Sequence, residues 1–114
     1  MNLQAAYLLP IISKLKRQAN SPGLSRGPQC LILSPTRELA VQIQTEANLY
    51  SNGTGLKTCC ICGGRAIFHQ KLLLQRGCNV VVATPGRLLQ FLDEGVLNMA
   101  SVKYFVLDEA DRML

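Results

Sequence analysis

The chain has 114 residues, a formal net charge of +5 and 48% hydrophobic residues with no tryptophan. This length suits one small domain with an aliphatic core and is short for a complete nucleotide-hydrolysing domain, while the basic charge mildly favours a polyanionic partner such as nucleic acid. No apolar stretch approaches membrane-spanning length and no secretory leader is evident, so we expect a soluble intracellular protein, nuclear or cytoplasmic, without membrane contact.

Hydrophobic periodicity predicts a helix over residues 3–16, in which Pro10 causes a kink or a late start. Residues 20–28 are rich in Ser, Gly and Pro and predict an exposed loop. Beyond this loop, short apolar runs predict four strands, and the segments between them predict three more helices. The predicted strands are Cys30–Leu33, 58–62, 79–83 and Tyr104–Leu107, and the predicted helices are 36–50, 66–75 and Pro85–Asp93.

Regular alternation of strands and helices indicates the fold class. Strands that alternate with helices form a parallel sheet through right-handed crossovers, with helices on both faces. We therefore expect an α/β domain, and we expect any ligand site at the carboxyl ends of its strands.

The cysteine pattern is typical of core thiols. Five are present, an odd number: Cys30, Cys59, Cys60, Cys62 and Cys78. They lie in or beside the predicted strands, so we favour free thiols in a reducing compartment, without disulfide partners, over disulfides. A zinc site of Cys60, Cys62 and His69 is the weaker alternative, because no second Cys-x-x-Cys pair supports it.

An acidic tetrad follows the last predicted strand, which we expect to be short and buried. Its three carboxylates are Asp108, Glu109 and Asp111. The first acid after such a strand can hold Mg²⁺ through water, and the second can orient or deprotonate a water that attacks a phosphate. Taken alone, acids after a strand more often cap the next helix, so the pattern needs support from elsewhere in the chain.

Two junctions repeat one local pattern at predicted strand ends. One runs over residues 34–39 and the other over residues 84–89. In each, a Ser or Thr can cap the helix, a proline fits its first turn, and an arginine stands two residues after the proline. A helix start with an arginine suits a phosphate group. Either junction alone only indicates the start of a helix. Two such junctions on one edge of the sheet favour binding of successive phosphates of a nucleic-acid backbone.

With the turn at Gly63–Gly64, these segments occur in the order and rough spacing of a known family. The chain resembles the DEAD-box ATP-dependent RNA helicases over almost its whole length, in the middle of their first RecA-like domain. The resemblance implies a partial RecA-like three-layer sandwich, in which a parallel sheet of at least four strands has helices on both faces.

The resemblance also implies roles for residues and cofactors. Asp108 would hold Mg²⁺ on ATP through water, Glu109 would be the catalytic base, and Asp111 would contact a second RecA-like domain. ATP and Mg²⁺ would be the cofactors of the complete protein, and RNA its partner. The implied contacts to the RNA backbone are Pro35, Thr36, Arg37, Gly64, Thr84, Gly86 and Arg87.

One departure from the family concerns the phosphate loop. Where the family has Gly-Lys-Thr, this sequence has Asn2, Leu3 and Gln4. We therefore expect residues 1–114 to be an incomplete N-terminal helicase domain that starts after the phosphate loop and ends at the tetrad. Such a fragment, truncated gene model or splice product would not hydrolyse ATP alone and would expose apolar surface. The alternatives are a non-catalytic RNA-binding module and, more weakly, a DNA-acting helicase or another nucleotide hydrolase.

Overall fold

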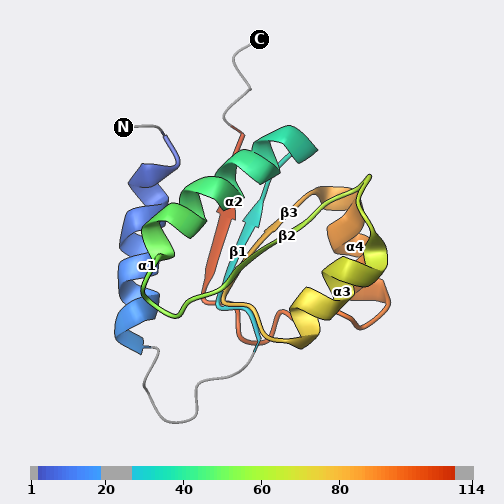
Figure 1. Ribbon diagram of the computed structural model, residues 1–114. Coiled ribbons are helices and arrows are strands. Elements are labelled where there is room, and N and C mark those ends of the chain that lie inside the picture. The colour runs from blue at the N-terminus through green and yellow to red at the C-terminus, as the bar shows by residue number, and fades with distance from the viewer. Residues whose placement is uncertain (1–2, 19–26, 110–114) are drawn as a thin grey trace.

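The computed structural model describes residues 3–18 and 27–109, which form four helices and four strands in strict alternation (Figure 1). The elements are α1 (Ala5–Gln18), β1 (Cys30–Leu33), α2 (Arg37–Ser51), β2 (Thr58–Ile61), α3 (Ile67–Gln75), β3 (Val80–Ala83), α4 (Pro85–Asp93) and β4 (Tyr104–Leu107). The order confirms the predicted α/β class, and the observed ends differ from the predicted ones by two residues at most.

The four strands form one parallel sheet in the order β2-β3-β1-β4. Their last residues are in register: Leu33 is aligned with both Ala83 and Leu107, and Ile61 is aligned with Ala83. All four strands therefore end at one edge, and the loops that follow them meet there.

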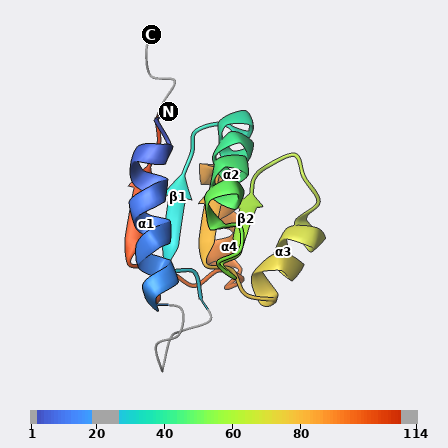
Figure 2. The ribbon, with the colours of Figure 1, turned by 60° about the vertical axis from the view of Figure 1, so that its left-hand side comes forward.

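Helices cover both faces of the sheet, which confirms the predicted three layers (Figure 2). Alternate strand residues point to opposite faces, so Ile32 and Val82 pack against α1 and α2, whereas Leu31 and Val81 belong to a second cluster with Phe91 of α4. Such continuous apolar runs are typical of strands buried on both faces.

The N-terminal helix begins at Ala5, two residues later than predicted, because the carbonyls of Leu3 and Gln4 form a preceding turn. Pro10 lies inside the helix, and its exposed position keeps it off the buried stripe.

Of the predicted loop over residues 20–28, positions 20–26 lie outside the described residues. The expectation of exposure is wrong for Pro28, which is buried where the chain enters β1.

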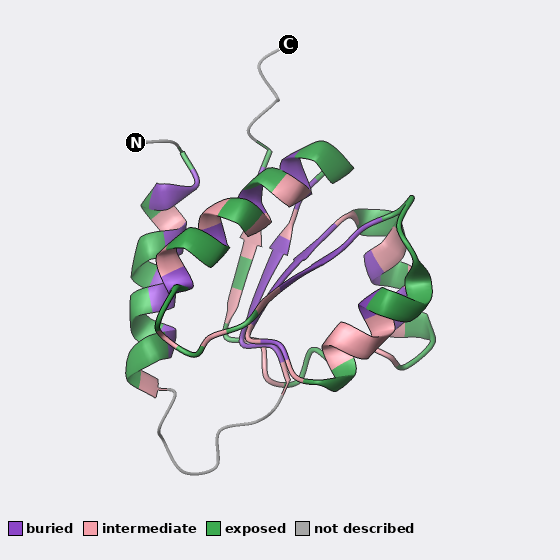
Figure 3. Cartoon of the chain, in the orientation of Figure 1, coloured by how far each residue is buried: buried purple, intermediate pink, exposed green. Residues whose placement is uncertain are grey.

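The expectation that the last strand is buried is also wrong. Among the described strands, β4 pairs only with β1, and Phe105 and Leu107 are 60% and 56% exposed (Figure 3). Tyr104 and Val106, on the other face, pack against the α1–α2 cluster. The sequence run is apolar at every position, but no helix in the described part of the chain covers the second face of this edge strand.

The five cysteines are all buried and free, as predicted for core thiols. Sγ of Cys60 lies 3.8 Å from Sγ of Cys62 on one face of β2. Among the described residues, no cluster of three His, Cys, Asp or Glu side chains is arranged to hold a metal ion. None of the described helices is both long and apolar enough to cross a bilayer.

The exposed face of β4 gives a first prediction. Replacing both Phe105 and Leu107 with threonine keeps strand propensity and removes apolar surface from an open edge. We expect the 114-residue chain to aggregate more slowly and to bind less of the dye ANS. The matched control is Leu89→Thr, which removes a side chain that is 60% exposed on α4. An equal effect of the control would contradict a specific role for the β4 edge.

Candidate functional site at the carboxyl edge of the sheet

The first junction connects β1 to α2 and ends in a capped helix. Thr36 is the N-cap residue, and its Oγ1 accepts a hydrogen bond of 3.1 Å from the backbone N–H of Leu39. The prediction that the proline occupies the first helical turn is wrong here, because Pro35 precedes the cap. Arg37 is therefore the first helical residue, at the positive end of the helix dipole.

The second junction, from β3 to α4, has a different geometry. Thr84 is the N-cap residue and Pro85 is the first helical residue, as predicted, but the Thr84 side chain does not cap its own helix. Its Oγ1 accepts a hydrogen bond of 3.4 Å from the backbone N–H of Gly63 instead. The hydroxyl therefore links two loops, and the two similar sequence patterns have different local roles.

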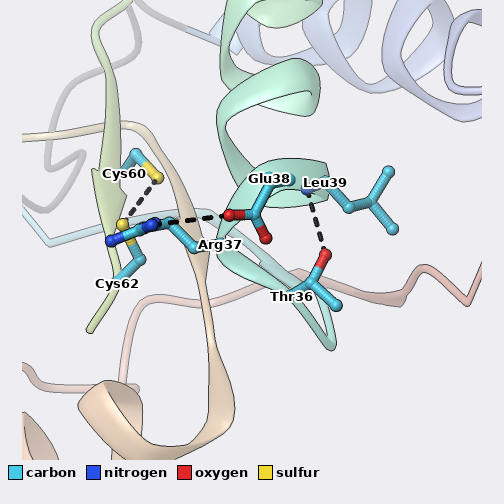
Figure 4. Close-up of polar contacts among 6 residues, drawn as sticks. All are labelled: Thr36, Arg37, Glu38, Leu39, Cys60 and Cys62. Carbon is cyan, nitrogen blue, oxygen red and sulfur yellow. Dashed lines mark hydrogen bonds and ion pairs between the residues drawn. The ribbon is translucent and has the colours of Figure 1, made fainter. Parts of the chain in front are cut away.

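The glycine turn after β2 lies against the arginine of the first junction. Gly64 has a φ of 79°, and a Cβ at this position would collide with Nη1 of Arg37. Glycine is required here both for its backbone angle and for this close approach. Arg37 also forms an ion pair with Glu38 at 3.5 Å (Figure 4). Both side chains are at least half exposed, so this pair adds little and leaves the guanidinium open to a ligand.

Arg87 is held from three directions. Its Nη1 donates to Oε1 of Gln70 at 2.8 Å and to the carbonyl of Arg65 at 3.4 Å, and its guanidinium carbon lies 5.8 Å from the Phe91 ring centroid. Gln70 is buried, and its Nε2 donates to the carbonyl of Cys62 at 3.1 Å. We missed Gln70 in the sequence, because a lone amide on a short helix without a clear apolar stripe gives no signal.

The first acid of the tetrad lies on another part of the same edge. Asp108 is buried, and its Oδ2 accepts hydrogen bonds from the hydroxyl of Tyr7 at 2.6 Å and from Nε2 of Gln4 at 3.3 Å. Burial, and then the hydrogen bond to Asp108, raise the pKa of Tyr7 well above its usual range. The sequence contained no sign of the role of Tyr7, although we had singled out Gln4 as a departure in the phosphate loop.

The remaining predicted site residues take simpler positions. Glu109 is exposed beside Asp108, and Gly86 is the second residue of α4. Asp111 lies outside the described residues. The structure thus brings the predicted residues to one edge, as two groups: an acid that faces α1, and three interlinked loops that carry Arg37, Gly64 and Arg87.

A parallel sheet between two helical layers, with its polar residues collected at the carboxyl edge, defines an α/β domain of the RecA-like class. Two solved structures share this fold. The yeast DEAD-box splicing factor Prp28 matches with a TM-score of 0.80 and 38% identity over 96% of this chain and 26% of its own. A hypothetical ATP-dependent RNA helicase from Sulfolobus tokodaii matches with a TM-score of 0.78 and 31% identity over 95% and 29% of the two chains.

The chain belongs to the DEAD/DEAH box helicase family, whose model matches residues 5–114. It is 49% identical over 110 residues to the ATP-dependent RNA helicase vasa of Drosophila melanogaster, covering 96% of this chain and 16% of vasa. It is 50% identical over 111 residues to the probable ATP-dependent RNA helicase DDX17 of Mus musculus, covering 96% and 17%. The chain thus spans about a sixth of the length of these relatives.

The contact between Gly64 and Arg37 gives a second prediction. Gly64→Ala adds both left-handed strain and a collision with the guanidinium, so we expect stability to fall by about 1–2 kcal/mol and Arg37 to be displaced. Gly53 has a φ of 80° with nothing near its missing Cβ, so Gly53→Ala carries the strain alone. Chemical denaturation measures the stability, and a larger loss for Gly64→Ala than for Gly53→Ala would report the collision. Equal losses in the two variants would contradict this account.

The Tyr7–Asp108 hydrogen bond gives a third prediction. Tyr7→Phe should lower the free energy of unfolding at pH 7 by about 1–2 kcal/mol, because a donor to a buried carboxylate is lost. The folded state raises the pKa of Tyr7 above its ordinary value of 10.0, so this stabilisation is complete below pH 10 and is lost as the phenol ionises at higher pH. Denaturation curves from neutral to alkaline pH should show the two proteins converging. A constant difference between them above pH 10 would argue against the assignment.

Proposed function

We propose that this chain supplies part of the RNA-gripping surface of an ATP-dependent RNA helicase. The observation that carries the proposal is the linkage of three loops at one sheet edge. Arg37 lies over Gly64, the backbone of Gly63 donates to Thr84, and Arg87 donates to the carbonyl of Arg65. Loops held in this way present their arginines at fixed positions, and fixed donors lose little entropy when they bind a ligand.

The chemistry of these loops suits a sugar-phosphate backbone. The first turns of α2 and α4 direct backbone N–H groups outward with the positive ends of their dipoles. Arg37 and Arg87 add charged donors, and Gly64 and Gly86 allow a ligand to approach the backbone closely. The proposed RNA contacts are Pro35, Thr36, Arg37, Gly64, Thr84, Gly86 and Arg87. Contacts of this kind position a strand and carry no base specificity.

The acids take their proposed roles only in a complete protein that binds ATP and Mg²⁺. Asp108 has an oriented carboxylate, which suits a water-mediated metal ion, and Glu109 beside it is open to a water. Bound Mg²⁺ would offset the charge of the phosphates. Asp111 would contact a second RecA-like domain. We propose that residues 1–114 alone do not turn over ATP, because Leu3 replaces the lysine that holds the phosphates.

The second candidate is a non-catalytic RNA-binding module. It is favoured by the side chains around Asp108, where Gln4 and Tyr7 both donate to Oδ2. Gln4 stands where the family has the hydroxyl that binds magnesium, so an amide donor takes the place of a metal ligand. RNA-stimulated ATP turnover by the purified 114-residue chain would refute this candidate. RNA binding without turnover is expected of both candidates and does not separate them.

The arginines give a fourth prediction. Arg37→Ala and Arg87→Ala should each weaken binding of single-stranded RNA, equally for two unrelated sequences, and should each reduce the salt dependence of log Kd by about one unit. Fluorescence anisotropy at several salt concentrations measures both effects. Arg17→Ala, on the exposed side of α1, is the control with the same loss of charge. A sequence-dependent loss, or an equal loss in the control, would contradict the proposed grip.

A further inference from the structure

β2 is an edge strand of the sheet and runs between α2 on one face and α3 on the other (Figure 2). A groove lined by basic side chains follows its outer edge. It consists of two cavities of about 380 and 390 Å³ that share Leu73 of α3 in their walls. Cys60 lines the first cavity, and Thr58 and Cys59 line the second. The groove therefore has a strand edge as its floor and one helix on each side.

The backbone of β2 alternates between the sheet and this groove. The carbonyls of Lys57 and Ile61 accept hydrogen bonds from the β3 side, so those of Thr58, Cys60 and Cys62 face outward. Two glutamine side chains occupy the ends of this outward row. Nε2 of Gln44 donates to the carbonyl of Thr58 at 3.4 Å, and Nε2 of Gln70 donates to that of Cys62 at 3.1 Å.

The centre of the row is left for a partner. Between the two glutamine contacts, no described side-chain amide reaches the backbone of Cys60. Cys60 is 6% exposed and lines the first cavity, and the alternation of the strand directs its N–H and C=O outward. Addition of a strand to such an edge is a common mode of peptide recognition. Side-chain amides that already bind the neighbouring carbonyls show that this edge accepts amide donors.

The charge of the groove selects the kind of peptide. Four basic side chains line it, and no carboxylate is among its lining residues: the basic ones are Lys57, Arg65, His69 and Arg76. The nearby carboxylate of Glu94 is paired with Lys71 at 2.9 Å. Burial, together with the neighbouring Cys62 thiol, raises the pKa of Cys60 to about 12, whereas a hydrogen bond with Cys78 lowers the pKa of Cys59. The cations of the groove are therefore not opposed by a thiolate at Cys60.

We propose that this groove binds an acidic, extended segment of a partner protein, which adds to the sheet as a fifth strand beside β2. The backbone of Cys60 would pair with the peptide backbone. Peptide amides would take the places of the Gln44 and Gln70 amides on the neighbouring strand carbonyls. The flanking Lys and Arg side chains would bind the peptide carboxylates. The phosphates of RNA could bind the basic side chains, but RNA has no peptide backbone to pair with the strand edge. We therefore favour a peptide. The groove adjoins the proposed RNA grip, because Arg65 and Gln70 in its wall accept hydrogen bonds from Arg87. The peptide proposal does not depend on that RNA grip.

The test uses the full-length protein and two fluorescent peptides of alternating Glu and Val. One is unmodified, and the other is N-methylated at alternate residues, which keeps its charge and blocks strand pairing. We expect the unmodified peptide to bind and to protect the Cys60 amide from hydrogen exchange, and we expect the methylated peptide to bind more than about tenfold more weakly, since main-chain hydrogen bonds provide the affinity in strand addition. Equal binding of both peptides would overturn the proposal.

Charge reversal in the groove locates the binding. Lys57→Glu and Arg76→Glu change exposed side chains, and each should weaken the peptide by about three- to tenfold. Arg17→Glu is the control, because Arg17 lies on α1 and does not line the groove. It should change the affinity for the peptide less than about twofold. A single-stranded RNA competitor completes the experiment. If RNA displaces the peptide and both groove variants weaken RNA binding as much as peptide binding, the groove is an RNA site and the proposal fails.

Discussion

The structure depends on the common register in which its four parallel strands end. The last residues of the strands are aligned, so the loops that follow all begin at one edge of the sheet; these last residues are Leu33, Ile61, Ala83 and Leu107. A shift of one residue in any strand would turn its side chains to the opposite face of the sheet and move its loop. β1, β2 and β3 are buried on both faces, where α1 and α2 pack on one side of the sheet and α3 and α4 on the other, whereas the second face of β4 is exposed.

At this edge, polar contacts between loops fix the loops relative to one another, which the packing of helices on the sheet does not do. Thr84, Gly64 and Gln70 each connect one loop or strand end to another, so three crossovers that are distant in the sequence are held together. Buried amides such as Gln70 are costly unless both ends are satisfied, and here both ends are. The consequence is a rim in which Arg87 is held in place, while Arg37, half exposed, remains accessible.

The sequence was a good guide to the elements and a weaker one to their environment. The four strands were located within one residue because short apolar runs between turn residues have few alternatives. Burial of the last strand was misjudged, since an apolar run does not show whether both faces will be covered: Phe105 and Leu107 remain exposed. The two arginine junctions looked alike, yet the Thr84 hydroxyl binds Gly63 whereas that of Thr36 caps its own helix.

The amino-acid sequence by itself determined the alternation of strands and helices, the parallel sheet, and the edge at which the arginines and acids would meet, because these follow from local periodicity and general rules of connection. Only the tertiary structure decided which side chains hold that edge. The contacts of Gln70 with Arg87 and of Tyr7 with Asp108 join segments that are 17 and 101 residues apart. Their partners are fixed by how the helices pack on the sheet, and no local pattern encodes that arrangement.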